Sequence, residues 1–282
     1  MSRLGLVLEG GGMRGVYTAG VLDFLMDHDI YTDGVIGVSA GACHGCSYVS
    51  KQRGRAYRVN VPYIHDKRYA GVRSLFKTGD LFNADFIYDL IPNKLDPYDY
   101  QTFYQAAIPF YAVSSNLETG KAEYHRCVSM KDDVQYVRAS ASLPLLANII
   151  EIDGKKLLDG GVCDSIPIHQ FRKMGYDKNI VVLTQCAEYR KGKNNLLPIL
   201  RVVYKQYPKF IHALETRHIV YNRTLKDLAD LEKKGEVFII RPSTPVTISR
   251  LEKNEEKLQA LYQQGYHDAE NLYDSLLAFI QK

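Results

Sequence analysis

Two short apolar segments, each followed directly by glycines, constrain the fold more than any other feature of the sequence. Leu4–Leu8 leads into Gly10–Gly12, and Val35–Val38 leads into Ser39 and Gly41. Apolar or small residues at helical spacing follow each glycine cluster. A buried strand that turns through glycines into a helix is the repeating unit of α/β proteins. The sequence therefore predicts an α/β fold with a mostly parallel sheet.

Further apolar segments extend this sheet, and two regions depart from its rhythm. Residues 60–106 are rich in Tyr and Phe and are predicted as a helical excursion between strands. Residues 251–280 have helical spacing interrupted at Gly265, which predicts a terminal helix or helix pair that caps the domain. The remaining predicted strands are Phe110–Ser114, Lys121–Tyr124, Lys156–Leu158, Ile180–Thr184 and Val237–Arg241.

The second glycine cluster has the pattern of a nucleophile elbow. Gly37-Val-Ser39-Ala-Gly41 matches G-x-S-x-G, in which a sharp strand-to-helix turn lifts a serine hydroxyl clear of the sheet. The short pattern is weak alone, but the apolar strand before Ser39 and the small residues after it fit such a turn. We interpret Ser39 as a candidate nucleophile, with a plain glycine-rich turn as the alternative.

The first glycine cluster allows two functional interpretations. Gly10-x-Gly12-x-x-Gly15 is the dinucleotide-binding pattern, correctly placed between a strand and a helix. That site needs an acidic residue at the end of the second strand, whereas Asp33 precedes this strand and Ser39 follows it. The same glycines could direct backbone N–H groups at an oxyanion. Together the two clusters favour a serine hydrolase, with a nucleotide-binding oxidoreductase or an inactive binding protein as alternatives.

A serine nucleophile needs a base, and none of the eight histidines has an obvious catalytic context. His44 is five residues beyond Ser39 and is expected on the helix, below the reactive hydroxyl. Asp159 ends an apolar strand and precedes two glycines, so we expect its carboxylate at the carboxyl-end edge of the sheet, beside Ser39. A buried carboxylate with a raised pKa could take the serine proton directly. A simple D-G-G turn is the alternative.

Four blocks of the sequence resemble, in order, those of the patatin-like phospholipase family. The resemblance spans about residues 4–185. It implies a three-layer α/β/α sandwich with a mostly parallel central sheet, and lipid acyl hydrolysis by a Ser–Asp dyad. We expect a catalytic domain over 1–190, which includes the insertion 60–106, and a C-terminal extension over 191–282 packed on the same domain. The blocks are Glu9–Gly15, Gly37–Gly41, Ala139–Pro144 and Asp159–Gly161, and Ser115–Gly120 resembles a further turn of the family.

Carried over by position, the resemblance assigns Ser39 as the nucleophile and Asp159 as the base. Gly37 and Gly41 flank the elbow. No cofactor or metal is expected, and the substrate is a lipid or another ester. Transfer of the acyl chain to a second lipid by an acyltransferase stays open beside hydrolysis. The oxyanion hole is expected from the loop of Gly10, Gly11, Gly12, Met13, Arg14 and Gly15.

The excess positive charge is concentrated in one segment. The formal net charge is +4, yet residues 190–223 alone contain eight Lys and Arg side chains and one Glu, interleaved with apolar residues. This pattern suits peripheral contact with an anionic membrane surface, and a solvated helix face is an equal alternative. No nucleic-acid partner is expected, because no recognition motif accompanies the charge. No oligomeric state is predicted.

Cysteine usage and hydropathy indicate a soluble cytoplasmic protein. The five cysteines do not form a disulfide framework. Cys43 and Cys46 have the spacing of a redox or metal site, but no second pair follows, so a packed helix is favoured. Leu4–Leu8 is too short for a signal sequence, and no segment approaches the ~18 apolar residues of a membrane span.

Overall fold

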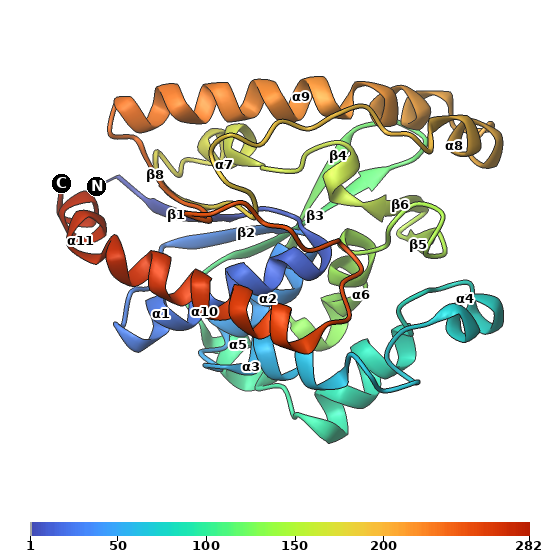
Figure 1. Cartoon of the computed structure of the whole chain (residues 1–282), viewed down its shortest axis with the longest axis horizontal. Helices are drawn as coiled ribbons and strands as arrows, with labels where there is room; N and C mark the ends of the chain where they lie inside the picture. The colour runs from blue at the N-terminus through green and yellow to red at the C-terminus, as the bar shows by residue number, and fades with distance from the viewer. Residues whose placement is uncertain (1) are drawn as a thin grey trace.

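One eight-stranded sheet runs through residues 2–282, the part of the chain that the computed structural model describes (Figure 1). Its strand order is β5-β6-β3-β2-β1-β7-β8, and β4 pairs with β3. Five neighbouring strands are parallel to one another, in the order β3, β2, β1, β7 and β8. The other three, β4, β5 and β6, are antiparallel to the strands that they pair with. The strands are β1 (Leu4–Leu8), β2 (Gly34–Val38), β3 (Phe110–Asn116), β4 (Ala122–Cys127), β5 (Ile150–Ile152), β6 (Lys155–Asp159), β7 (Lys178–Val182) and β8 (Val237–Ile240).

Helices cover both faces of the sheet, which confirms the three-layer α/β/α sandwich and the mostly parallel sheet. In Figure 1, α1 (Val16–Asp27), α2 (Ala40–Val49) and α10 (Glu255–Asn271) lie on one face, and α7 (Ile168–Lys173) and α9 (Pro208–Lys233) lie on the other. Successive side chains of a strand point to opposite faces. Accordingly, Leu6 and Leu8 of β1 join the core beneath α1 and α10, and Val7 joins the core beneath α7 and α9.

The predicted strands are all present. β1 and β2 are buried on both faces, and strands of this kind have continuous apolar sequences. Every residue of β2 is buried. The sequence analysis missed β5, which has only three residues and an exposed centre. An edge strand of three residues is too short to show a periodic sequence pattern, so it could not be predicted.

The aromatic-rich segment 60–106 is helical, as predicted, and connects α2 to β3. Tyr69, Phe86 and Ile91 form a small hydrophobic core of its own. Its elements, with the short helix before it, are α3 (Arg55–Arg58), η2 (Val61–Tyr63), α4 (Val72–Thr78), the π-helix η3 (Phe86–Leu95) and α5 (Tyr100–Gln105).

The C-terminal helix pair is confirmed, but the predicted interruption at Gly265 is wrong. Gly265 lies buried inside α10, and the break falls at Leu272, before α11 (Tyr273–Gln281). A Cβ on Gly265 would collide with the carbonyl oxygen of Tyr17, so the glycine permits close packing of α10 on α1. A glycine that breaks a helix and a glycine that lets two helices approach look alike in sequence.

The segment 191–282 contributes to every layer of the sandwich. β8 extends the sheet beside β7, α9 covers one face, and α10 packs on α1 across the other. Within residues 2–282 no helix is both long enough and apolar enough to cross a membrane. The other helices are η1 (Gly12–Gly15), α6 (Met130–Ser140), η4 (Gly160–Val162) and α8 (Leu197–Val203).

Candidate active site

Ser39 occupies a strained turn between β2 and α2. Its backbone angles are φ 55° and ψ −121°, a conformation that non-glycine residues rarely adopt and that concentrates at functional sites. The Ser39 N–H donates to Ser140 Oγ at 2.8 Å, and Ser140 Oγ donates to the carbonyl of Val113 at 2.5 Å. A Cβ on Gly41 would lie 2.5 Å from the Leu8 carbonyl oxygen, so only glycine fits there. The turn therefore has the geometry of a nucleophile elbow.

The Ser39 hydroxyl donates directly to Asp159. The Oγ–Oδ2 distance is 2.6 Å, and both residues are buried, with 6% and 3% of their surface exposed. Asp159 Oδ1 accepts the N–H of Gly161 at 2.7 Å. Burial raises the pKa of Asp159, while the Ser39 hydrogen bond and the charges of Arg217 and Arg250 oppose that rise. A carboxylate held in this way can take the proton of the hydroxyl.

Asp159 reaches this position by a different route from the predicted one. The sequence predicts its carboxylate at the carboxyl-end edge of a mostly parallel sheet, beside Ser39, whereas β6 itself is antiparallel to β3. Asp159 pairs with Ser114 of β3, one residue beyond the level at which Val113 pairs with Val38 of β2. The pairing register, rather than a shared strand direction, brings Asp159 beside Ser39.

No histidine of residues 2–282 forms a hydrogen bond with Ser39. His44 lies on α2, is buried, and has a ring Nδ1 without a partner in the described chain. Burial lowers its pKa to about 4, so the ring is neutral at physiological pH. The contact between Ser39 and Asp159 therefore needs no intervening imidazole.

The glycine loop that follows β1 lies next to the elbow. The Gly10 N–H donates to the Ser165 carbonyl at 3.4 Å, and the Met13 N–H donates to the Arg250 carbonyl at 3.0 Å. The N–H groups of Gly11 and Gly12 donate to nothing within the described residues. Gly12 and Met13 line the same cavity as Ser39. Of the predicted loop, Gly11 and Gly12 thus keep backbone donors for a ligand.

The acidic residue required by the dinucleotide interpretation is at the wrong end of the sheet. Asp33 precedes β2, and its Oδ2 accepts the Leu4 N–H at 2.7 Å, at the start of β1. The glycine loop and Ser39 follow the opposite ends of these strands. On α2, Cys46 Sγ donates to the Cys43 carbonyl at 3.0 Å, and Cys43 Sγ lies 3.8 Å from Tyr88 Oη.

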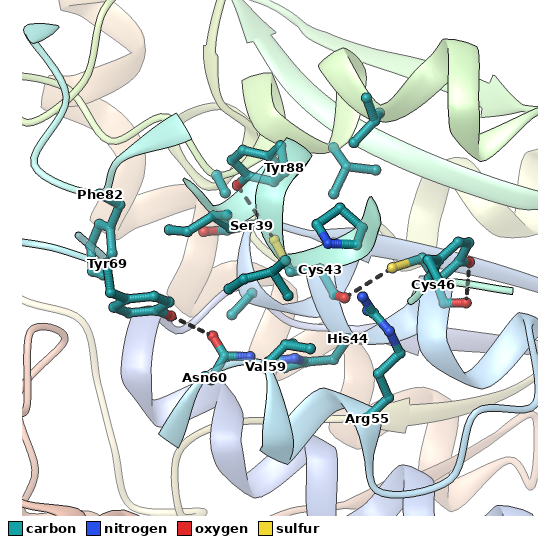
Figure 2. A pocket seen from close by; sticks show the side chains of 18 of the residues that line it. Ser39, Cys43, His44, Cys46, Arg55, Val59, Asn60, Tyr69, Phe82 and Tyr88 are labelled. Carbon is teal, nitrogen blue, oxygen red and sulfur yellow. Dashed lines mark hydrogen bonds between the residues drawn. The ribbon is translucent and has the colours of Figure 1, made fainter. Parts of the chain in front are cut away.

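An apolar cavity of about 150 Å³ opens beside Ser39. Figure 2 shows Ser39 near Tyr88 and Cys43, with Tyr69 and Phe82 to one side and Arg55 to the other. Much of the wall comes from the aromatic-rich segment 60–106, which supplies Tyr69, Phe82, Ile87, Tyr88, Ile91, Pro92, Tyr98 and Tyr100.

Sequence reasoning missed the charged surroundings of Asp159. Arg217 on α9 and Arg250 in the loop before α10 both act on its pKa. A signal for Arg217 was present, because the buried residues of α9 recur at spacings of three and four and Arg217 falls on that stripe. No local pattern marks Arg250. The buried stripe comprises Phe210, Leu214, Tyr221, Thr224 and Leu228.

Comparison with known proteins gives two family matches along the chain. The patatin-like phospholipase model matches residues 6–172, and a domain of unknown function (DUF6363) matches residues 207–281. The solved structure of VipD from Legionella pneumophila aligns with a TM-score of 0.49 and 13% identity, over 98% of this chain and 67% of VipD.

Curated relatives resemble part of the chain. The uncharacterized protein YjjU of Escherichia coli is 28% identical over 64% of this chain and 52% of its own length. The lysophospholipase nte1 of Aspergillus niger is 32% identical over 62% of this chain, and NTE1 of Cryptococcus neoformans is 30% identical over 64%. Only 11% of each lysophospholipase is covered, so this chain spans about half of YjjU and a small part of the other two.

The patatin-like phospholipase model covers more than half of the chain and includes the Ser39 elbow, Asp159 and the glycine loop. The resemblance drawn from the four sequence blocks is thereby confirmed. The chain belongs to the patatin-like phospholipase family, a family of lipid ester hydrolases.

Proposed function

We propose that this protein is a serine-dependent lipid acyl hydrolase in which Ser39 is the nucleophile and Asp159 the base. The observation that carries the proposal is the 2.6 Å hydrogen bond from Ser39 Oγ to the buried Asp159 carboxylate, beside an apolar cavity. Residues 1–190 would form the catalytic domain. Family membership and the lysophospholipase relatives support a lipid ester as the substrate.

The first half of the reaction transfers the acyl group to the enzyme. Ser39 Oγ attacks the ester carbonyl carbon while its proton passes to Asp159 Oδ2. The negative charge that develops on the carbonyl oxygen is stabilised by the N–H groups of Gly11 and Gly12, which have no other partner in residues 2–282. The bond to the alcohol oxygen then breaks, and that oxygen takes the proton from Asp159. The acyl chain remains on Ser39 as an ester.

The second half regenerates the enzyme. A water molecule gives its proton to Asp159 and attacks the acyl ester. The Ser39 oxygen leaves and regains its proton from Asp159, and the fatty acid is released. If the hydroxyl of a second lipid takes the place of water, the same steps transfer the acyl chain, so product analysis distinguishes a hydrolase from an acyltransferase.

Activity of active-site variants on a panel of lipid esters tests this function. Ser39→Ala should reduce turnover by on the order of 10⁶ and abolish labelling by a fluorophosphonate probe. Asp159→Asn should reduce turnover by about 10²–10⁴, the usual contribution of a general base. Full activity in Ser39→Ala would refute the proposal.

Ser47→Ala is the matched control. Ser47 is buried on α2, close in sequence to Ser39, and its hydroxyl has no hydrogen-bond partner in the described chain. Its removal therefore costs no polar contact, and this variant should keep both full activity and fluorophosphonate labelling. A loss as large as in Ser39→Ala would mean that the assay reports damage to α2 rather than loss of the nucleophile.

We also propose that the protein is cytoplasmic and that the region of α8 contacts the surface of anionic membranes. Ile199 and Val202 expose 54% and 71% of their surface, and Lys205 is an exposed cation near them, whereas Arg201 is paired with Glu215. An amphipathic surface of this kind inserts apolar side chains while its cations meet lipid headgroups. Sedimentation with vesicles should be stronger with anionic than with neutral lipid, and equal, negligible binding to both would refute the contact.

A further inference from the structure

A second cavity borders the candidate dyad from the side of Asp159. Its volume is about 490 Å³, larger than the apolar cavity beside Ser39. Asp159 lines this second cavity and Ser39 lines the first, so their hydrogen bond joins residues of the two cavities, and Leu143 lines both. Most of the other walls come from the loop after β7, from α8 and α9, and from the loop before α10. These segments follow residue 172, at which the match to the patatin-like phospholipase model ends.

Cations gather in this cavity from three separate segments of the chain. Lys191, Arg217 and Arg250 line it, and Arg14 of the glycine loop lies close enough to interact with Arg250. Burial and the neighbouring arginines lower the pKa of Lys191 to about 7, and burial and Arg250 lower the pKa of Arg217 to about 10. The positive charges therefore lie near one another in a partly desolvated place.

Within residues 2–282 no carboxylate forms an ion pair with this cluster, although Glu9 and Asp159 lie near enough to act on it. None of the four side chains forms an ion pair or donates a hydrogen bond to the described chain, and the buried Nε atoms of Arg14 and Arg217 have no partner. The Lys191 ammonium lies 4.0 Å from the centre of the Tyr221 ring, an interaction that stabilises a cation without neutralising it. The four side chains are half-buried, and crowding partly desolvated cations without an ion pair is unfavourable, so we take the cluster as a site for an anionic ligand.

The two nearby carboxylates are already engaged. Glu9 accepts hydrogen bonds from Tyr221 Oη at 2.7 Å and from the Thr184 N–H at 2.7 Å. Asp159 accepts from Ser39 and from the Gly161 N–H. The exposed Lys193 also lines the cavity, so four cavity-lining cations and Arg14 face two occupied carboxylates. The region therefore has a net positive charge, and the buried Nε donors of Arg14 and Arg217 have no acceptor in the described chain.

We propose that this cavity binds a phosphate group, and that Lys191, Arg217 and Arg250 hold the phosphodiester of a phospholipid substrate there. The inference rests on the proposed hydrolase function and adds the residues that recognise the phosphate of its substrate. With the ester carbonyl at Ser39 and the acyl chain in the apolar cavity, the alcohol part of the substrate extends past Asp159. In a phospholipid the phosphate follows within a few bonds of the ester. Guanidinium groups match phosphate oxygens in charge and geometry.

Substrate selectivity tests the proposal. The ratio of kcat/KM for a phospholipid to kcat/KM for a diacylglycerol with the same acyl chains is measured in uncharged detergent micelles. Lys191→Met and Arg250→Met should each lower this ratio by about tenfold or more, because a charge-assisted contact to phosphate is lost. Damage to the chemical step affects both substrates and cancels in the ratio. Lys234→Met, which removes an exposed cation at the end of α9 and outside the cavity, should leave the ratio unchanged.

Binding of inorganic phosphate is a second test, which does not depend on enzymatic activity. Binding to the whole protein, measured by calorimetry and by thermal stabilisation, should be lost in Lys191→Met. A lowered selectivity ratio in the two variants identifies the ligand as a lipid headgroup. Phosphate binding that depends on Lys191, with an unchanged ratio, identifies it as a free phosphate ion instead.

An unchanged ratio together with no phosphate binding by the wild-type protein would overturn the site. The hydrolase proposal would survive that result as long as Ser39→Ala remains inactive. Conversely, a wild-type protein that hydrolyses no ester but binds phosphate through Lys191 would refute the proposed function and keep the anion site.

Discussion

Removing the charge of Arg217 should move the acid limb of the pH–rate profile upward. Asp159 accepts a proton only when it is deprotonated, so activity is present above its pKa and is lost as the pH falls through it. Burial already raises that pKa, and the positive charge of Arg217 opposes the rise. In Arg217→Met the opposing charge is gone, the pKa of Asp159 increases, and activity should decline at a higher pH than in the wild type.

The size of the effect follows from the separation of the two charges. A Cβ on Gly161 would lie 2.9 Å from Asp159 Oδ1 and 3.1 Å from Arg217 Nη2, so these two atoms are no more than about 6 Å apart. At that distance the interaction is worth about 3 kcal/mol at an effective dielectric constant of about 20, and about 0.7 kcal/mol in bulk water. The acid limb should therefore move by between about half a pH unit and two pH units.

The assay is kcat/KM against pH on a neutral ester without phosphate, so that the proposed anion site does not contribute. Arg217→Lys retains a charge and should keep most of the wild-type profile. Arg223→Met removes an exposed charge from the same helix and should not move the acid limb. An unmoved limb in a folded, active Arg217→Met would refute the assignment of that limb to Asp159 beside Arg217. Equal movement in Arg223→Met would indicate a general effect of net charge.

Three further predictions concern the frame of the site. Tyr221→Phe removes the 2.7 Å hydrogen bond to the buried Glu9 and should lower the free energy of unfolding by about 1.5–3 kcal/mol in urea denaturation, whereas an unchanged midpoint would contradict the bond. Gly265→Ala should destabilise the protein by about 1–3 kcal/mol through overpacking, although alanine favours helices, and the exposed Gln263→Ala should not. Because burial lowers the pKa of His44 to about 4, its ring signals in NMR should show no titration between about pH 5 and 8.

The reactive serine could be predicted from the sequence because its requirements are local. A strand buried on both faces must be apolar, and a strained turn packed against β1 requires small residues around it. Both conditions are visible in Gly37–Gly41. The position of Asp159 is not a local property, because its strand pairs antiparallel with β3 and the register of that pairing depends on the whole sheet. The expected neighbour was right, and the reason given for it was wrong.

The basic segment 190–223 shows what a charge count along the chain leaves out. The count predicts a positively charged surface, and Lys205 and Arg223 are indeed exposed. Lys191 and Arg217 instead turn toward the cavity beside Asp159, and Arg201 forms an ion pair with Glu215 at 2.6 Å. The position of Arg217 on the buried stripe of α9 was readable from helical periodicity. The direction of Lys191, in a loop, was not.

The glycine loop and the proposed phosphate site are linked through one residue. Arg250 contributes its side chain to the cationic cavity, while its carbonyl accepts the N–H of Met13 in the loop whose neighbouring N–H groups we assign to the oxyanion. Phosphate held by the Arg250 side chain would therefore restrain the backbone that fixes Met13 and, next to it, Gly12. Because only a bound phospholipid supplies both the phosphate and the ester, this connection would favour phospholipids in the chemical step as well as in binding. The C-terminal segment, outside the part of the chain that carries the four family blocks, would then determine which esters the shared Ser–Asp chemistry acts on.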